Sequence, residues 1–226
     1  MKTILGFDTS GEVLSICLKH GSRYYEINTI DGYKHAQTLM PLIDRIIQKM
    51  NLQVEDIELI ACSKGPGSFT GLRIGVSTAK GLAYGLGIPY VLVPSLDAIA
   101  VRHSFFNGVV LPVIDARKGR FYAAFYKNGQ RITDYMDIEP EKLRAKSSQF
   151  SQVLLTGSGA PQFLSGNRDD TFLQDSFYDS GISRNIICLG EKQFNDRGPS
   201  GISEGPLYLR KSEAELNRME NPADGE

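Results

Sequence analysis

The first 30 residues show the alternation of apolar and polar positions that short β-strands have. Apolar runs extend from Thr3 to Phe7 and from Val13 to Lys19, and a third run extends from Arg23 to Asn28. Aspartate and glycine, which favour turns, follow the first run at Asp8 and the third at Asp31-Gly32. The pattern predicts three strands joined as a meander.

After residue 38 the hydrophobic period changes to that of an amphipathic helix. Proline is tolerated near the start of a helix but disrupts its interior, because it has no N–H to donate. Since Pro41 lies in this segment, we expect Thr38 to be the N-cap and the helix to run to about residue 50. His35 then precedes the helix, as a surface or locally hydrogen-bonded residue rather than a catalyst. The apolar face consists of Leu39, Leu42, Ile43, Ile46, Ile47 and Met50.

A glycine-rich turn follows the apolar run from Ile57 to Ser63, and a helix from about 70 to 86 follows the turn. Gly65 and Gly67 permit backbone angles that other residues avoid, and Ser68 or Thr70 can cap the helix. Free N–H groups at a helix start favour phosphate, so a phosphate site and a tight turn without a ligand both remain open. The turn has neither the Walker A pattern nor G-x-G-x-x-G.

One face of this helix carries almost no side chains. Small residues recur at every fourth position, which places them on a slowly drifting stripe. Such a stripe lets another backbone approach closely, either from the same chain or from a helix of a second chain. The stripe consists of Gly71, Gly75, Ala79, Ala83 and Gly87.

The chain then repeats its opening pattern. After a short strand from Tyr90 to Val93 and a helix capped by Ser95, an apolar run from Gly108 to Ile114 ends at Asp115. In both places an apolar strand ends at an aspartate, and a turn with glycine and a returning strand follow. The repetition predicts two halves of similar architecture, residues 1–104 and 105–216, each a mixed sheet covered by helices.

The second half has a weaker pattern. We expect strands at Met136 to Ile138 and Val153 to Thr156, and a helix from Pro140 to Phe150. The polar segment from Ser165 to Ser183 predicts a loop, whereas Ile186 to Leu189 is compatible with a strand or the start of a helix. The polar segment 217–226 is expected to be a disordered tail.

The chain has 226 residues, 41% of them apolar, and a net charge of −1, which is the composition of an ordinary globular protein. A pI near 6.3 argues against strong independent binding of nucleic acid. Three scattered cysteines and the lack of a signal peptide or long apolar run predict a cytoplasmic protein that is not embedded in a membrane. The three histidines lack metal spacing, and neither H-E-x-x-H nor G-x-S-x-G occurs.

Together these motifs resemble those of the TsaB (YeaZ) family. The resemblance rests on Ile4-Leu-Gly-Phe-Asp8, His35-Ala-Gln-Thr-Leu-Met-Pro-Leu, Gly65-Pro-Gly-Ser-Phe-Thr-Gly-Leu-Arg-Ile-Gly75, Asp115-Ala-Arg-Lys-Gly-Arg and Pro206-Leu-Tyr-Leu-Arg. It covers roughly residues 1–130, fades, and returns at 206–216. The resemblance implies an α/β, actin-like (ASKHA, ribonuclease-H-like) duplicated fold. It also implies a role in making threonylcarbamoyladenosine at position 37 of tRNAs that read codons beginning with A.

By this resemblance the chain is a partner subunit rather than the enzyme. The related TsaD protein transfers the threonylcarbamoyl group with a metal held by His-x-x-x-His, and this chain has Ser95-Leu-Asp-Ala-Ile99 at that place. The expected partners are TsaD-like and TsaE-like proteins, with a homodimer when the chain is alone and tRNA reached only through the complex. No metal or cofactor is expected on the chain itself, and ATP enters only through the TsaE-like ATPase.

The resemblance also implies that the helices at about 38–50 and 70–86 form the partner interface. An interface of this kind buries about 1,600 Å² or more. We expect Gly75→Leu or Ala79→Trp to abolish pairing while the monomer stays folded, unless the small-residue stripe packs inside the chain. The expected interface residues are Leu39, Leu42, Ile46, Gly71, Arg73, Ile74, Gly75, Thr78, Ala79 and Leu82.

An alternative function belongs to another class. In actin-like phosphotransferases two aspartates face magnesium and phosphate across a cleft, and Asp8 and Asp115 occupy those places, with Gly65 and Gly67 as possible phosphate contacts. The simpler interpretation of both aspartates is that they accept hydrogen bonds in turns.

A basic cluster offers one more candidate contact. Arg117, Lys118 and Arg120 lie together on one predicted turn. They are candidates for contact with tRNA phosphates or an acidic partner, and a solvated turn is the plainer alternative.

Overall fold

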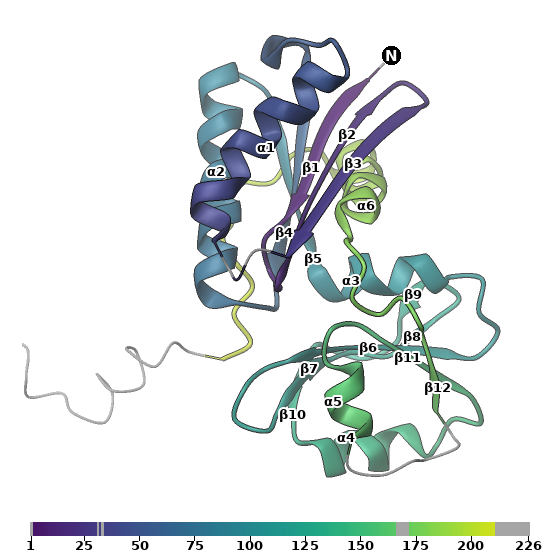
Figure 1. The fold of residues 1–226 in the computed structure, drawn as a ribbon. Helices are drawn as coiled ribbons and strands as arrows, with labels where there is room; N and C mark the ends of the chain where they lie inside the picture. The colour runs from purple at the N-terminus through teal and green to yellow at the C-terminus, as the bar shows by residue number, and fades with distance from the viewer. Residues whose placement is uncertain (1, 31, 33, 166–171, 211–226) are drawn as a thin grey trace, which may run out of the picture.

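The computed structural model describes residues 2–30, 32, 34–165 and 172–210, and it contains two sheets of related topology (Figure 1). In the first sheet the strand order is β3-β2-β1-β4-β5. The first three strands are antiparallel, and β4 and β5 extend the sheet parallel to β1. The strands are β1 (Thr3–Asp8), β2 (Val13–His20), β3 (Arg23–Ile30), β4 (Leu59–Gly65) and β5 (Tyr90–Pro94).

The second sheet repeats this plan, with the order β10-β7-β6-β11-β12. Its pairings are again antiparallel on the side of β7 and β10 and parallel on the side of β11 and β12. The predicted duplicated actin-like fold is therefore confirmed. The strands are β6 (Val109–Asp115), β7 (Phe121–Ala123), β8 (Tyr126–Lys127), β9 (Gln130–Arg131), β10 (Met136–Ile138), β11 (Val153–Thr156) and β12 (Phe172–Gln174).

The helices cover the sheets. Helices α1 and α2 share a hydrophobic core with one face of the first sheet, whereas α6 packs on its other face, against β1, β4 and β5 (Figure 1). The helix bounds are α1 (His35–Lys49), α2 (Phe69–Leu86), α3 (Ser95–Ala100), α4 (Pro140–Ser147), α5 (Ala160–Leu164) and α6 (Ser183–Arg197), with short 3-10 turns at Val54–Asp56 and Val101–His103.

Helix α6 comes late in the sequence but packs on the first sheet. Residues 183–197 belong to the second half by position in the sequence, yet their side chains join a core with Ile4, Leu59 and Val91 of the first sheet. The sequence of Ile186 to Leu189 is compatible with a strand or the start of a helix, and the structure forms a helix there. The predicted tail at 217–226 lies outside the described residues.

Several predicted boundaries are wrong for identifiable reasons. Helix α1 begins at His35 rather than after Thr38, and Pro41 lies inside it. Of the two alternatives for His35, the surface position is wrong, because the residue is buried. Its side chain is hydrogen-bonded instead, since Nε2 lies 2.8 Å from the carbonyl oxygen of Gly11 in the turn after β1. Ser95 is the first residue of α3 instead of its cap, and its hydroxyl donates to Ser10.

The segment from Ser165 to Ser183 is not only loop, because it contains β12. Its three residues pair in parallel with β11, which a polar composition does not reveal. The short helix α5 is also absent from the sequence prediction. Ser68, by contrast, caps α2 as expected, since its side chain accepts a hydrogen bond from the N–H of Gly71 at 3.3 Å.

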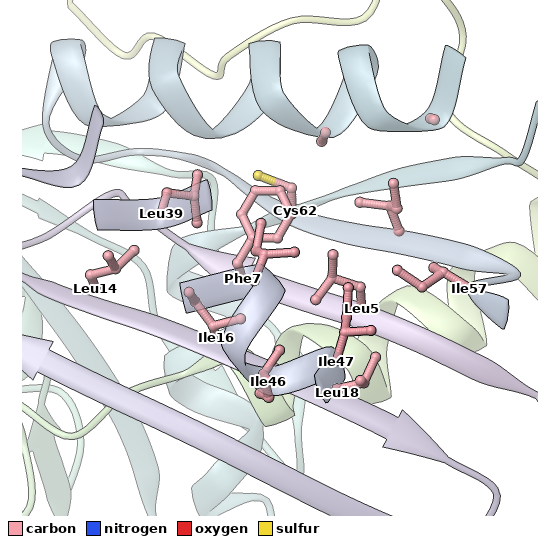
Figure 2. Packing of buried hydrophobic residues seen from close by; sticks show 14 of the residues in the cluster. Leu5, Phe7, Leu14, Ile16, Leu18, Leu39, Ile46, Ile47, Ile57 and Cys62 are labelled. Carbon is pink, nitrogen blue, oxygen red and sulfur yellow. The ribbon is translucent and has the colours of Figure 1, made fainter. Parts of the chain in front are cut away.

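The principal core lies between the first sheet and helices α1 and α2. Figure 2 shows Leu5, Phe7 and Cys62 from the strands gathered with Leu39 and Ile46 from α1. All five side chains are at most 1% exposed. A second core fills the other half around Leu111, Phe125 and Phe163.

The small-residue stripe of α2 faces this interior. A Cβ atom on Gly71 would stand 2.0 Å from the carbonyl oxygen of Thr9, and one on Gly75 would stand 2.4 Å from the Thr9 hydroxyl oxygen. Ala79 is completely buried. Gly71, Gly75, Ala79 and Ala83 therefore pack inside the chain, whereas Gly87 is the exposed C-cap of α2. This contradicts the expectation that Gly75→Leu or Ala79→Trp leaves the monomer intact.

The outer face of α2 carries a different set of small residues. Gly81 and Gly85 are exposed, and a Cβ on either would meet nothing within 4 Å. Each glycine costs about 1 kcal/mol of helix propensity relative to alanine, and no contact within the described chain offsets that cost.

Alanine substitutions at Gly75 and Gly81 test whether the inner face of α2 is packed and the outer face is not. We expect Gly75→Ala to lower the free energy of unfolding by about 1–3 kcal/mol, because the new methyl group overlaps Thr9. Gly81→Ala should raise it by about 0.5–1 kcal/mol. Urea denaturation followed by circular dichroism measures both; a Gly75→Ala protein as stable as the unaltered one would contradict the packing described for this stripe.

Candidate functional site

A cleft of about 920 Å³ lies between the two halves. One wall is formed by the turn after β1 and the start of α2, and the other by the turn after β6, with Asp115, Arg117 and Lys118. Residues 207–210 of the C-terminal segment also line it. A smaller cavity of about 290 Å³ shares Ser10, Gly11 and Glu12 with the cleft and includes Asp8 in its lining.

Asp8 is only 6% exposed, and its carboxylate is used inside the protein. Oδ1 accepts a hydrogen bond from the N–H of Ser10 at 2.9 Å and a shorter one from the Ser63 hydroxyl. Burial raises the pKa of Asp8, and the hydrogen bonds from Ser63 and Ser10 only partly offset this effect. By accepting these hydrogen bonds, the Asp8 side chain stabilises the turn that follows β1.

Asp115 occupies the matching place in the second half. Its Oδ1 accepts a hydrogen bond from the N–H of Arg117 at 2.8 Å, two residues along, as Asp8 accepts from Ser10. Its other oxygen, Oδ2, lies 3.6 Å from the Arg117 guanidinium. Both aspartates thus adopt the turn-acceptor arrangement. Within the described residues, no three His, Cys, Asp or Glu side chains form a group that could hold a metal ion.

The glycine turn is filled by its own chain. Gly65 has φ +103°, and a Cβ there would stand 2.9 Å from the carbonyl oxygen of Leu207. A Cβ on Gly67 would stand 2.5 Å from the carbonyl oxygen of Ser10, which also accepts the N–H of Ser68 at 2.7 Å. Close packing against the neighbouring turn therefore explains both glycines, and phosphate binding is not needed to explain them.

The predicted basic cluster does not stay together. Arg120 turns away to Asp137, which its Nε contacts at 2.7 Å, and to Glu139. Arg117 and Lys118 remain on the lining of the cleft. The sequence could not separate them, because the carboxylates that hold Arg120 lie 17 and 19 residues away.

The C-terminal segment is a cleft wall that the sequence pattern did not reveal. The N–H of Leu207 donates to the carbonyl of Lys64 at 2.6 Å, and the ring of Tyr208 packs on Phe69 with centroids 4.9 Å apart. Arg210 then makes two hydrogen bonds to Asp137 in the second half, at 2.8 and 2.9 Å. This segment, residues 207–210, therefore contacts both halves. In the sequence, Pro206-Leu-Tyr-Leu-Arg210 stands out only through its resemblance to the family motif.

The ten expected interface residues fall into two groups. Five are buried in the core of the chain itself: Leu39, Ile46, Gly71, Gly75 and Ala79. Leu42, Ile74, Thr78 and Leu82 are partly exposed, and Arg73 is exposed. The Arg73 guanidinium lies 4.0 Å from the centroid of the Phe69 ring and its Nε donates to the Tyr208 hydroxyl, so it has partners within the chain. We define the outer α1–α2 face as Leu42, Ile74, Thr78, Gly81, Leu82 and Gly85.

Two substitutions test the structural role of Asp8. Asp8→Asn keeps an acceptor oxygen for Ser10 and Ser63 and removes a buried charge, so stability at pH 7 should be unchanged or higher. Asp8→Ala leaves both donors without an acceptor, and the free energy of unfolding should fall by about 1–3 kcal/mol.

The pH dependence provides a second readout for Asp8. Because its folded pKa is raised above the ordinary 3.8, the native state holds a proton that the unfolded state has lost, and stability falls as pH rises from 3.8 through the folded pKa. Asp8→Asn should lack this component in urea denaturation between pH 4 and 8. A loss of stability as large in Asp8→Asn as in Asp8→Ala would overturn the turn-acceptor role.

Within the described part of the chain, no helix is both long and apolar enough to cross a membrane.

Comparison with known proteins identifies related chains. Residues 30–149 match the family model described as TsaD, tRNA N6-adenosine threonylcarbamoyltransferase. Two proteins named tRNA threonylcarbamoyladenosine biosynthesis protein TsaB match nearly end to end. The one from Escherichia coli K12 is 35% identical over 93% of this chain and 96% of its own length. The one from Buchnera aphidicola (Baizongia pistaciae) is 33% identical, over 93% of each chain. The Bacillus subtilis protein of the same name is 38% identical over 56% of this chain and 57% of its own length.

Solved structures agree with the sequence comparison. YeaZ from Pseudomonas aeruginosa superimposes with a TM-score of 0.79 over 92% of this chain and all of its own, at 24% identity. A Pseudomonas aeruginosa protein described as similar to peptidase YeaZ superimposes with a TM-score of 0.81, over 93% of this chain. The structures establish the shared fold, and the end-to-end sequence matches establish the family: the chain belongs to the TsaB (YeaZ) family.

Proposed function

We propose that this chain is a noncatalytic scaffold subunit that supports a TsaD-like transferase in making threonylcarbamoyladenosine at position 37 of tRNAs that read ANN codons. The family membership supports the pathway, because the relatives carry that biosynthesis in their names. The proposed setting is the cytoplasm. The other proposed partner is a TsaE-like ATPase, which supplies the only use of ATP, and tRNA is reached through the complex.

The residues that stand where the related TsaD protein has its metal ligands support a noncatalytic role. Ser95 is fully buried and its hydroxyl donates to Ser10 at 3.2 Å. Ile99 packs with two apolar clusters of the chain. Neither side chain has a nitrogen or carboxylate with which to bind a metal. The aspartates of the alternative phosphotransferase, Asp8 and Asp115, both accept hydrogen bonds in turns.

The observation that carries the proposed interface is the outer α1–α2 face. Gly81 and Gly85 lie one turn apart on α2, and a Cβ on either would meet nothing within 4 Å in the described chain. Leu42, Ile74 and Leu82 beside them are apolar and partly exposed. Small residues flanked by apolar ones allow a partner helix to approach closely and bury those side chains, which would offset the helix propensity that the glycines cost. The proposed occupant is the matching helix pair of the TsaD-like subunit, or of a second copy when that subunit is absent.

A tryptophan on the outer face tests this interface. Gly81→Trp should raise the dissociation constant for the TsaD-like protein of the same organism at least tenfold, because the indole separates the helices. The melting temperature should stay near that of the unaltered chain, since position 81 faces open space. Isothermal titration calorimetry measures the first and differential scanning calorimetry the second.

The matched control is Lys192→Trp, an exposed position on α6 at the opposite face of the sheet. It should pair like the unaltered chain. In the absence of the TsaD-like protein, light scattering should show Gly81→Trp shifted from dimer to monomer. Equal pairing by the two tryptophan variants would place the interface elsewhere.

A further inference from the structure

We propose that the C-terminal segment, residues 207–210, is a conformational latch: Arg210 bound to Asp137 holds the two halves at one separation, and release of this pair lets them rotate apart. This device goes beyond the proposed function, because it acts within one chain and needs no partner. Three observations lead to it: the attachment of the segment to the first half, the geometry of the Arg210–Asp137 pair, and the position of a second group of contacts between the halves.

The chain that follows α6 is attached to the first half at several points. The Lys80 ammonium donates a hydrogen bond to the carbonyl of Ile202 at 2.8 Å, beside α2. Lys64, at the end of β4, pairs with Glu204 at 2.7 Å, and its carbonyl accepts the N–H of Leu207 at 2.6 Å. Up to this point the C-terminal segment is therefore part of the first half, although it ends beside the second.

Arg210 makes the contact with the second half. Its Nε and Nη2 donate to the two carboxylate oxygens of Asp137 at 2.8 and 2.9 Å, and its Nη1 donates to the carbonyl of Ala116 at 3.3 Å. Two parallel hydrogen bonds fix orientation as well as distance, which a single contact does not. The two side chains are only 25% and 15% exposed, so water and salt screen this pair less than a surface ion pair.

Asp137 is held in place independently of Arg210. Arg120 donates from Nε to its Oδ1 at 2.7 Å and from Nη2 to its backbone carbonyl at 2.5 Å, and Arg120 also pairs with Glu139. Burial by itself raises the pKa of Asp137, but the hydrogen bonds from Arg210 and Arg120 outweigh it and keep the pKa below the usual value. The acceptor is therefore ionised and preformed, so the latch can close again after Arg210 has left.

A second group of contacts between the halves lies around α3. Asp97 Oδ1 accepts hydrogen bonds from the hydroxyls of Tyr126 and Tyr135, at 2.5 and 2.8 Å. Arg102, just after α3, donates to the carbonyl of Gly181 at 2.9 Å. None of these five residues lines the cleft, whereas residues 207–210 do. Figure 1 shows α3 to the right of the region between the halves and the yellow C-terminal chain to the left. This arrangement is that of a hinge on one side and a releasable ion pair on the other.

The test measures the distance between the halves in the chain alone. Spin labels are attached to Thr70→Cys, at the exposed start of α2, and to Glu141→Cys, an exposed position on α4. The exposed native cysteine is removed as Cys188→Ser, and Cys17 and Cys62 are buried. Labelled chains are diluted with an excess of unlabelled chains, so that each distance comes from one molecule. Double electron–electron resonance then gives the distance distribution.

We expect Arg210→Ala to lengthen the mean distance by several ångströms and to broaden its distribution. Arg210→Lys keeps the charge but cannot form the two parallel bonds, so its distance should be intermediate. Leu207→Pro/Tyr208→Ala detaches the segment from the first half while Arg210 stays intact, and it should lengthen the distance as Arg210→Ala does. The matched control is Lys19→Ala, which removes the ion pair with Glu191 inside the first half and should leave the distance unchanged.

Each outcome decides the proposal. A longer distance in Arg210→Ala and in Leu207→Pro/Tyr208→Ala, with Lys19→Ala unchanged, supports the latch. An unchanged distance in either of the first two, or an equal increase in Lys19→Ala, overturns it. Circular dichroism shows whether each variant is folded, and Arg210→Lys decides the question if Arg210→Ala is not. Because the chain is measured without a TsaD-like protein, failure of the latch and failure of the proposed interface are distinguishable.

Discussion

The contact between α2 and Thr9 is the constraint on which the rest of the molecule depends. The Thr9 hydroxyl donates to the carbonyl of Gly71 at 2.7 Å, at a backbone approach that leaves no room for a side chain on Gly71 or Gly75. This contact holds the first helix turn against the turn after β1, so it sets one wall of the cleft. It also fixes which face of α2 points outward. The position of the cleft and the orientation of the outer α1–α2 face therefore have a common cause.

Duplication explains the architecture, and divergence between the halves explains the candidate chemistry. Both halves end their first strand in an aspartate that accepts the N–H two residues along. In the first half that turn is packed beneath α2 and its carboxylate is buried. In the second half the turn is open and carries Arg117 and Lys118. One turn is thus a packing element, whereas its counterpart carries charged side chains on the lining of the cleft.

Local pattern was enough to predict most of the strands: the run from Val13 to Lys19 matches β2 to within one residue, and the run from Ile57 to Ser63 matches β4 to within two. Local pattern did not predict the features that contacts between residues far apart in the sequence determine. His35 begins α1 because its ring meets the carbonyl of Gly11, and Arg120 leaves the cleft because of Asp137. The spacing of Gly71 and Gly75 correctly indicated a close approach but could not say that Thr9 makes it. The spacing of small residues predicts that one face of a helix is packed closely, but it does not identify the residue that packs against that face.

The return of α6 to the first sheet has a consequence for how the protein is made. Ile4, Leu59 and Val91 lie on a sheet face that is covered largely by α6, through residues such as Ile186 and Ile187, and in part by Ala98 of α3. During synthesis the strands of the first sheet leave the ribosome about a hundred residues before the helix that covers this face. The first half therefore cannot mature as an independent unit while the second is being translated. Part of this apolar face therefore stays uncovered until α6, residues 183–197, has emerged.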